Sequence, residues 1–300
     1  MVWLTDRLLF PCFLLWILGS TCAFLRLNVP ASLVAACVIA PAVIAVAILE
    51  RLRPERDDYR APDQPLRVEA GHFLVGVEAG SILAYGAAVV LASACASLLT
   101  ARFGGSLWPS RWPIAAQVAL AALLGECLGY WQHRLGHRLR ALWRFHALHH
   151  SGARLNVVRA GRFHFVDIAA GTFLTYAPLA LLGAPPSVFA WLASMAGTLG
   201  VLQHANIRMR TPAWLDAAVC TPAVHRLHHS RDRRESDGNF GTFVMLFDHL
   251  FGSYVPPVAP GPAACGIEDD PVPRGFWAQV VAPFGVTRSR NAGSTVSDAN

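Results

Sequence analysis

The sequence has 300 residues, of which 54% are hydrophobic and 15% charged, and its mean hydropathy is +0.40. This composition is too apolar and too weakly charged for an ordinary soluble domain, so we expect an integral membrane protein. The net charge is +6 and every basic residue is arginine. Because most arginines lie in loops beside apolar segments, a membrane-flanking role explains them better than binding of nucleic acid.

Four apolar segments in the first half of the chain are predicted to cross the membrane. Residues 8–25 and 29–49 form a predicted hairpin of two spans. The first segment lacks a small-x-small cleavage site and the second follows closely, so we expect a retained span rather than a signal peptide. The next two spans are predicted over 73–99 and 113–131. Positive charge concentrates after the second and fourth spans, which predicts a cytoplasmic N-terminus and cytoplasmic histidines.

A further apolar segment, residues 168–202, is interrupted by Gly183, Pro185 and Pro186. Its halves are short for full spans, so a re-entrant hairpin and two tight spans both remain open. Either arrangement returns the chain to the side from which it started. The polar, arginine-rich segment 134–162 before it is predicted to form a helical layer in the cytoplasm.

These segments predict an all-α fold, a polytopic membrane helical bundle with a cytoplasmic histidine-rich helical cap. We divide the chain into N-terminal spans and a loop (1–112), a histidine-rich unit (113–255) and a Pro/Gly-rich tail (256–300). The tail is expected to be partly disordered, above all in its last dozen residues. The seven cysteines are scattered and lack a CxxC motif, so no disulfide framework is expected.

Eight of the twelve histidines fall into three groups with helical spacing. The groups are His133 and His137; His146, His149 and His150; and His225, His228 and His229. Residues three or four apart share a helix face, so each group is predicted to project from one face. A single histidine usually has a structural role, but three such groups predict metal binding. Eight or more imidazoles exceed the ligands that one metal takes, so we expect two metal ions.

The position of each remaining histidine in the chain indicates whether it is a candidate metal ligand. His204 follows the interrupted apolar segment directly and should emerge at the same membrane face as His133, which makes it a candidate ligand. His164 is a weaker candidate, with Asp167 about one helical turn further on as a hydrogen-bond partner. The two remaining histidines have no cluster partners and are expected to be structural: His72 and His249.

Glu126 is a candidate catalytic residue because it lies inside an apolar span, two helical turns before His133. Such a carboxylate is expected to orient a ligand imidazole or to transfer protons. The alternative is a structural carboxylate that bonds to neighbouring helices. Glu78 raises the same question with less support. Asp237 and Asn239 in the motif DGNFG are expected to cap a turn or to anchor the nearby HRLHH segment.

The identity of the metal is argued from the ligand type. Zinc sites usually have four ligands, and the hydrolytic motif HExxH is absent from the sequence. A histidine-rich site with open positions beside a membrane suits iron and dioxygen better. Such a site is able to attack an unactivated C–H bond of a lipid.

Residues 126–254 resemble the fatty acid hydroxylase and sterol desaturase superfamily of integral-membrane di-iron oxygenases. The resemblance is carried by an acidic residue and YW before HRLGH, then by HALHH, QHAN, HRLHH, DGNFG and FDHLFGS. It implies that spans deliver lipid to a cytoplasmic cap. Many members that carry the RxH segment have proline after its histidine, whereas Phe165 stands here, which weakens a ligand role for His164. The resemblance implies two irons held by His133, His137, His146, His149, His150, His204, His225, His228 and His229.

We therefore predict an oxygen-dependent lipid hydroxylase or desaturase with two iron ions and O2 as co-substrate. Both reactions begin with the same hydrogen abstraction, so the sequence does not choose between them. Two alternatives stay open, a non-catalytic membrane metal-binding protein and a zinc-dependent membrane hydrolase. No flavin, haem or iron–sulfur domain is evident, so electrons are expected from a separate reductase or carrier.

Overall fold

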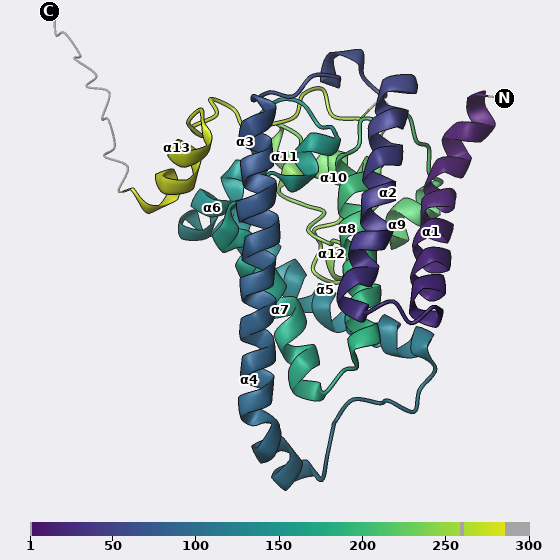
Figure 1. Cartoon of the computed structure of the whole chain (residues 1–300). Helices are drawn as coiled ribbons and strands as arrows, with labels where there is room; N and C mark the ends of the chain where they lie inside the picture. Colours follow the sequence, from purple (N-terminus) through teal and green to yellow (C-terminus); the bar gives the residue numbers. More distant parts are fainter. Residues whose placement is uncertain (1, 259–260, 286–300) are drawn as a thin grey trace, which may run out of the picture.

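A computed structural model describes residues 2–258 and 261–285 of the chain (Figure 1). Within these residues the structure is helical, and its only extended pairings are three isolated β-bridges. Long helices form the bundle: α1 (Val2–Arg26), α2 (Ala31–Leu52), α4 (Gly80–Phe103), α5 (Ile114–Arg138), α7 (Phe165–Leu182) and α8 (Pro186–His204). Shorter α-helices are α3 (Leu66–Gly71), α6 (Arg140–His150), α9 (Ala213–Ala218), α10 (Pro222–His228), α11 (Arg233–Ser236), α12 (Leu246–Leu250) and α13 (Phe276–Val281). The chain also forms three short 3-10 helices, η1 (Asp57–Tyr59), η3 (Val157–Gly161) and η4 (Ala282–Phe284), and a π-helix of eight residues, η2 (His72–Ala79).

Five helical segments in the described part of the chain are long and apolar enough to cross a membrane. They are Leu4–Arg26, Ala31–Leu52, Leu66–Ala96, Ile114–Arg138 and Phe165–Leu182. Little of their surface is buried within the protein, since between 11% and 28% of each apolar window lies inside. Together with the buried histidines described below, these spans confirm the predicted all-α membrane bundle.

Helices α1 and α2 form the predicted hairpin and pack on α8. Phe10, Phe13 and Ile17 of α1 meet Val46 of α2 and Leu202 of α8 in one apolar cluster. The Trp16 indole Nε1 also donates a hydrogen bond of 3.0 Å to the Val38 carbonyl. In hydrocarbon, helices gain from close packing and from such polar contacts, so this side of the bundle is firmly joined to α8.

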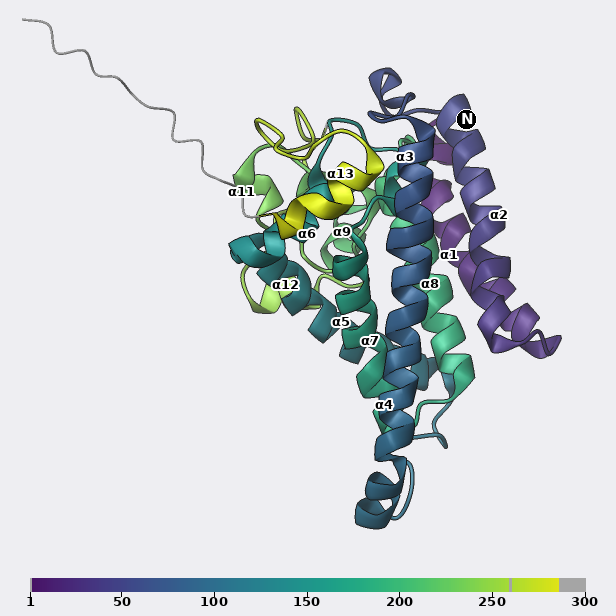
Figure 2. The ribbon, with the colours of Figure 1, turned by 60° about the vertical axis from the view of Figure 1, so that its left-hand side comes forward.

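Helices α3, η2 and α4 run as one continuous rod alongside α7 (Figure 2). The middle of this rod, η2, is a π-helix, a wider turn often found at functional sites. Gly76 lies in it, and a Cβ added there would collide with the carbonyl oxygen of Phe163. The rod therefore approaches the backbone of the segment before α7 as closely as glycine alone permits.

Helices α7 and α8 are the two halves of the interrupted apolar segment. Gly183 ends α7 in a left-handed conformation with φ 85°, and Pro186 opens α8. The helices have 18 and 19 residues, and only α7 is among the five candidate spans. Figure 1 shows that the pair returns the chain to the end of the bundle from which it departed. This return is the arrangement that the sequence analysis predicted.

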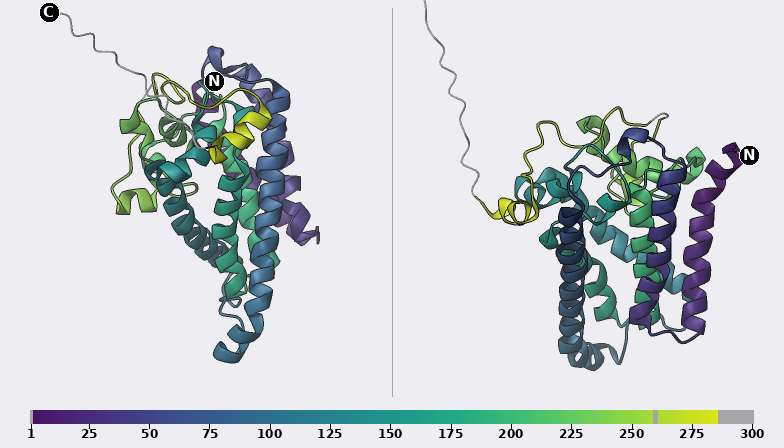
Figure 3. Two further views of the ribbon diagram at one scale, coloured as in Figure 1. Left: turned by 90° about the vertical axis from the view of Figure 1, so that its left-hand side faces the viewer. Right: turned by 45° about the horizontal axis from the view of Figure 1, so that its top comes forward.

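The short helices gather at one end of the bundle and form the cap (Figure 3). Part of the tail belongs to this cap, because α13 packs on α3 and η4 packs on α6. The Gln279 carboxamide of α13 lies 2.7 Å from His72 Nε2. Residues 261–285 thus include an ordered helix that the sequence analysis did not predict. The last dozen residues, predicted to be disordered, lie outside the described residues.

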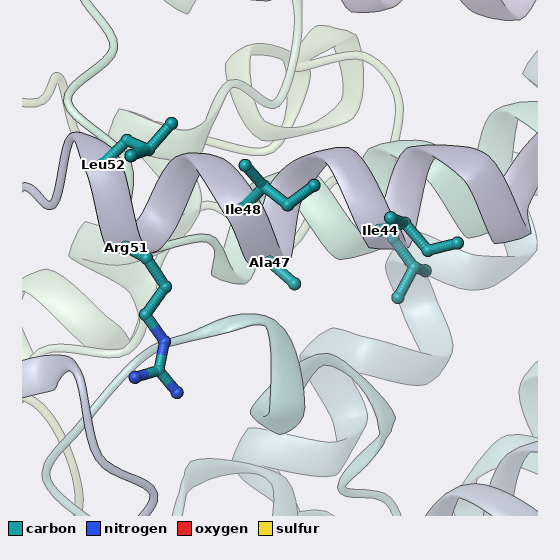
Figure 4. A pocket seen from close by; sticks show the side chains of 6 residues that line it. Ile44, Ala47, Ile48, Arg51 and Leu52 are labelled. Carbon is teal, nitrogen blue, oxygen red and sulfur yellow. The ribbon is translucent and has the colours of Figure 1, made fainter.

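A shallow apolar groove runs along the outer face of α2. Figure 4 shows Arg51 and Leu52 at one end of it and Ile44 at the other. Its lining contains no histidine and its only charged group is the Arg51 guanidinium. The groove is therefore separate from the candidate metal centre.

Candidate metal centre

Four helices bring the predicted ligands together at the boundary between bundle and cap. The last turns of α5 carry His133 and His137, and α8 ends at His204. Helix α6 carries the HALHH residues, and α10 with the residue after it carries HRLHH. Pro222 stands in the first turn of α10 and the Thr221 hydroxyl caps it, which starts this short helix one turn before His225.

The histidines form two groups, and within each group one ring nitrogen from every histidine lies within 4.8 Å of those of the others. The first group is His133, His137, His146, His150 and His228. The second group is His149, His204, His225 and His229. All nine are residues that the family resemblance implied as ligands.

Neighbouring histidines in the chain contribute to different groups. His149 belongs to the second group and His150 to the first, while His228 belongs to the first and His229 to the second. Adjacent residues on an α-helix diverge by about 100°, so one turn supplies ligands to two centres. The predicted shared face holds for His133 and His137. In the other two sets, residues four apart stay together, whereas residues three apart separate: His146 from His149, and His225 from His228.

The imidazoles converge through their Nε2 atoms. In the first group, His150 Nε2 lies 3.1 Å from His137 Nε2 and 3.2 Å from His146 Nε2. In the second group, His225 Nε2 lies 3.1 Å from the Nε2 atoms of both His204 and His229. Nitrogens that bind one metal at about 2.0–2.1 Å are separated by roughly this distance. The geometry fits one metal ion in each group.

Two further Nε2 atoms support this fit. Those of His133 and His228 are buried and have no hydrogen-bond partner among the described residues. An unpaired buried polar atom is costly. A metal ion in the first group would satisfy both.

The opposite nitrogen, Nδ1, contacts backbone carbonyls in three of the ligands. His133 Nδ1 donates to Phe240 O at 2.8 Å, and His228 Nδ1 to Gly238 O at 2.7 Å. His204 Nδ1 donates to Gly200 O, one turn earlier in α8, at 2.7 Å. A carbonyl only accepts, so each Nδ1 carries the proton and each Nε2 lone pair is free for a metal.

Carboxylates lie behind two more histidines of the first group. Asp167 accepts from His146 Nδ1 at 2.8 Å and from the Gln132 amide at 2.7 Å. Asp237 lies 3.5 Å from His137 Nδ1. A carboxylate behind an imidazole orients the ring and makes it a stronger ligand. Asp167, considered above as a partner of His164, thus bonds to His146 instead.

Burial keeps the imidazoles of the cap in the form that binds metal. Burial lowers the pKa of five histidines well below 6.5: His149, His150, His225, His228 and His229. Neighbouring imidazoles lower the pKa of these rings further. Removal from water penalises the charged ring. The rings are consequently neutral at neutral pH, as metal ligation requires.

Four residues of the DGNFG motif and the two residues after it form a segment across the first group that we call the strap, residues 238–243. Its backbone is held from two sides. The buried Glu126 carboxylate accepts from Thr242 N at 2.6 Å and Phe243 N at 2.9 Å. Asp248 accepts from Phe240 N and Gly241 N at 2.9 and 2.8 Å. The strap carries both carbonyls to which His133 and His228 donate.

His164 lies outside both groups. Its Nδ1 accepts from Val166 N at 3.2 Å and caps α7, and its Nε2 contacts Val280 O at 3.0 Å. Neither nitrogen is free for a metal. His72 and His249 also lie outside, and His249 Nε2 contacts Ala217 O at 2.8 Å. Glu78 lies on the exposed face of η2.

Two buried arginines were not identified from the sequence. Arg159 donates to His149 O at 3.1 Å, where α6 ends, and burial lowers its pKa to about 10, so it stays charged at neutral pH. Arg162 pairs with Glu69 at 2.7 Å and donates to Ser151 at 3.1 Å. A cation at a helix C-terminus is favourable, so these residues stabilise the end of α6. The only trace in the sequence was the RxH segment.

A helical membrane bundle that carries two buried groups of converging imidazoles is the arrangement of a membrane-bound metalloenzyme. The fatty acid hydroxylase family matches residues 118–253, inside the predicted unit 113–255. The ornithine lipid hydroxylase OlsE of Rhizobium tropici is 38% identical over 245 residues, which is 81% of this chain and 73% of that protein. The chain therefore belongs to the fatty acid hydroxylase family, whose members are lipid hydroxylases and monooxygenases.

More distant relatives share the same chemistry. The alkylglycerol monooxygenases of Danio rerio and Homo sapiens are 33% and 31% identical over 150 and 148 residues. The matched regions are 50% and 49% of this chain, and the chain spans 32% of the length of each of these two relatives. No solved structure matches the chain.

Proposed function

We propose that the protein is a di-iron, dioxygen-dependent hydroxylase of a membrane lipid, with one iron in each histidine group. The observation that carries the proposal is the convergence of ring nitrogens from nine histidines in two groups, within a family of lipid hydroxylases. We favour hydroxylation over desaturation because the relatives are named as hydroxylases and monooxygenases.

The residues that would hold the irons are the nine histidines of the two groups, without His164. When bound, the irons supply activation of dioxygen for attack on a C–H bond. The residues of the chain do the positioning. Phe240 O, Gly238 O and Asp167 fix the Nδ1 protons of three ligands, so their Nε2 atoms point inward.

Glu126 acts as a positioning residue rather than a proton carrier. Both of its oxygens accept backbone N–H bonds from the strap, so the carboxylate faces the strap. Through the strap it sets the place of Phe240 O and hence the ring of His133. Of the two roles expected from the sequence, orientation of a ligand is the one that these contacts support.

The proposed substrate is an amphipathic membrane lipid, and ornithine lipid is the first to test because OlsE is similar over most of the chain. Hydroxylation of R–H consumes O2, two electrons and two protons and yields R–OH and water. We propose that a separate electron donor supplies the electrons. The arginine-rich flanks of both histidine regions favour a cytoplasmic position for the cap.

The test uses the purified protein in lipid nanodiscs, loaded with iron, with ornithine lipid and a chemical reductant. We expect about two irons per chain and a product heavier by one oxygen atom. The label should come from isotopically heavy dioxygen and not from heavy water. A matched variant, His225→Ala, should lose metal and product together, whereas His249→Ala should retain both.

Three other results would contradict the proposal. Conversion of lipid without dioxygen and with zinc as the only metal would indicate a hydrolase. Stable binding of two irons with no dioxygen consumption under any reductant or lipid would indicate a metal-binding protein without turnover. A product lacking two hydrogens would indicate desaturation.

A further inference from the structure

The electrons needed for hydroxylation must enter the metal centre from outside, and one side chain lies between the centre and the surface. Trp143 of α6 is half-buried. Its ring centroid lies 5.2 Å from that of His137, 5.6 Å from that of His150 and 6.2 Å from that of His146. All three are ligands proposed for the first group. An aromatic ring in contact with metal ligands shortens the distance that an electron must cross.

The surface around Trp143 is basic. Four exposed arginines define what we call the arginine surface: Arg138, Arg140, Arg144 and Arg233. Arg140 and Arg144 are four residues apart in α6 and share a face. Acids beside them are fewer, since Asp232 is exposed while Glu235 and Asp237 are half-buried. The surface therefore has an excess of positive charge.

The arginine surface is connected to the first group through Asp237. This carboxylate lies 3.7 Å from Arg233 Nε on one side and 3.5 Å from His137 Nδ1 on the other. Arg233 is exposed over 75% of its side chain, whereas His137 is almost fully buried. A charge bound at Arg233 is thus two contacts away from a proposed iron ligand.

We propose that the arginine surface docks an acidic one-electron carrier protein and that Trp143 passes its electrons to the first histidine group. This inference rests on the proposed function. Two docking events oxidise two carriers by one electron each. Those electrons, with two protons, reduce one oxygen atom of O2 to water while the other enters the lipid.

The contacts of Trp143 and Asp237 favour a redox partner over the membrane surface as the occupant. Arginines that only bind lipid headgroups need no contact with metal ligands, whereas an electron carrier needs a short path. Charge complementarity also accelerates the encounter of a small acidic protein with its partner.

The first experiment measures reduction of the iron-loaded protein in zwitterionic nanodiscs by a reduced, acidic [2Fe–2S] ferredoxin. The double variant Arg140→Glu/Arg144→Glu should raise the KM for ferredoxin about tenfold or more, because reversed charge slows encounter. The matched control, Arg67→Glu/Arg208→Glu, reverses two exposed arginines that are not part of the arginine surface and should change it little. Added salt should weaken the wild-type reaction and spare the double variant.

The second experiment tests Trp143. Trp143→Leu should lower the rate at saturating ferredoxin and leave the KM for ferredoxin unchanged, and Trp143→Phe should restore part of the rate. Dithionite, a small reductant that needs no docking surface, should reduce every variant like the wild type. Iron content should stay at the wild-type level throughout.

The results separate this inference from the proposed function. Equal ferredoxin KM values for the double variant and its control would overturn the docking surface. If the double variant lost binding to anionic vesicles but kept its KM for ferredoxin, the docking surface would also be overturned. The arginine surface would then be assigned to the membrane. If the dithionite-reduced wild type, freed of excess dithionite and then exposed to dioxygen, forms no hydroxylated lipid, the proposed function would be overturned instead.

Discussion

His149 and His150 are consecutive residues whose imidazoles serve different histidine groups. A single helical turn of α6 therefore links the two proposed metal positions. We expect His149→Ala to lose the metal of the second group and His150→Ala that of the first, each leaving roughly one iron per chain. Metal analysis of both variants checks this, and activity should fall in both. Full metal content and full turnover in His149→Ala would overturn the ligand assignment.

Glu126→Gln should weaken the strap. An amide offers one oxygen to the two backbone N–H groups of Thr242 and Phe243, so a buried donor loses its partner at a cost of about 1–3 kcal/mol. We expect the protein to insert and fold, with reduced iron in the first group and reduced activity. Glu78→Gln is the matched control, because this carboxylate lies in another span and is exposed. Unchanged activity in Glu126→Gln would leave the residue with a packing role only.

His164→Ala should keep the metal and lose stability. The substitution removes the N-cap of α7, which typically costs about 0.5–2 kcal/mol. His164→Asn should restore part of that loss, since asparagine also caps helices. Metal content and the midpoint of thermal unfolding, measured on both variants, distinguish the cap from a ligand. Loss of iron from His164→Ala at unchanged stability would return this histidine to the ligand set.

Gly76→Ala should disturb the second histidine group from a distance. The new methyl group would push against the carbonyl of Phe163, whose ring stacks on His149 at 3.9 Å. We expect lower stability and reduced iron occupancy in this group. Gly86→Ala is the control, since a Cβ at this position of α4 meets no atom within 4 Å. Equal occupancy in the two variants would show that the contact yields without cost.

The topology predicts that α6 and α11 face the same side of the membrane. Single cysteines at Arg140 and Arg233, in a background without native cysteines, should both resist an impermeant reagent applied to intact cells. Both should react after permeabilisation. If one of them reacted from outside while the other was protected, the histidines of α6 and α10 would not share one centre.

The sequence was sufficient for the identity of the nine histidines and for the return of the chain through α7 and α8. Helical spacing and the length of apolar segments depend on nearby residues, so both are visible locally. The division of His149 from His150 was not visible, because spacing describes one helix and not the positions of its partners. The bonds of Glu126 join residues more than a hundred positions apart, and no local pattern signals them.

Other features depended on tertiary packing alone. Glycine is needed at position 76 of the π-helix because the carbonyl of Phe163 lies against it, and only the folded structure shows this contact. Helix α13 lies in a Pro/Gly-rich tail whose composition predicts disorder, and its contacts with His72 and His164 stabilise it. The same contacts explain why these two histidines are buried without serving either group.

The depth of the strap along the apolar span indicates which part of a lipid molecule lies level with the histidine groups. Its backbone reaches the carboxylate of Glu126, about three helical turns inside the apolar span Ile114–Arg138, and irregular backbone is tolerated at such a level only where protein encloses it. His133 lies about 8 Å from the end of that span at 1.5 Å per residue. A lipid lying in its leaflet brings carbons near its headgroup to this height, while its terminal methyl stays near the bilayer midplane. Under the proposed function, the height of the histidine groups would thereby select the bond to be oxidised before any side chain contacts the substrate.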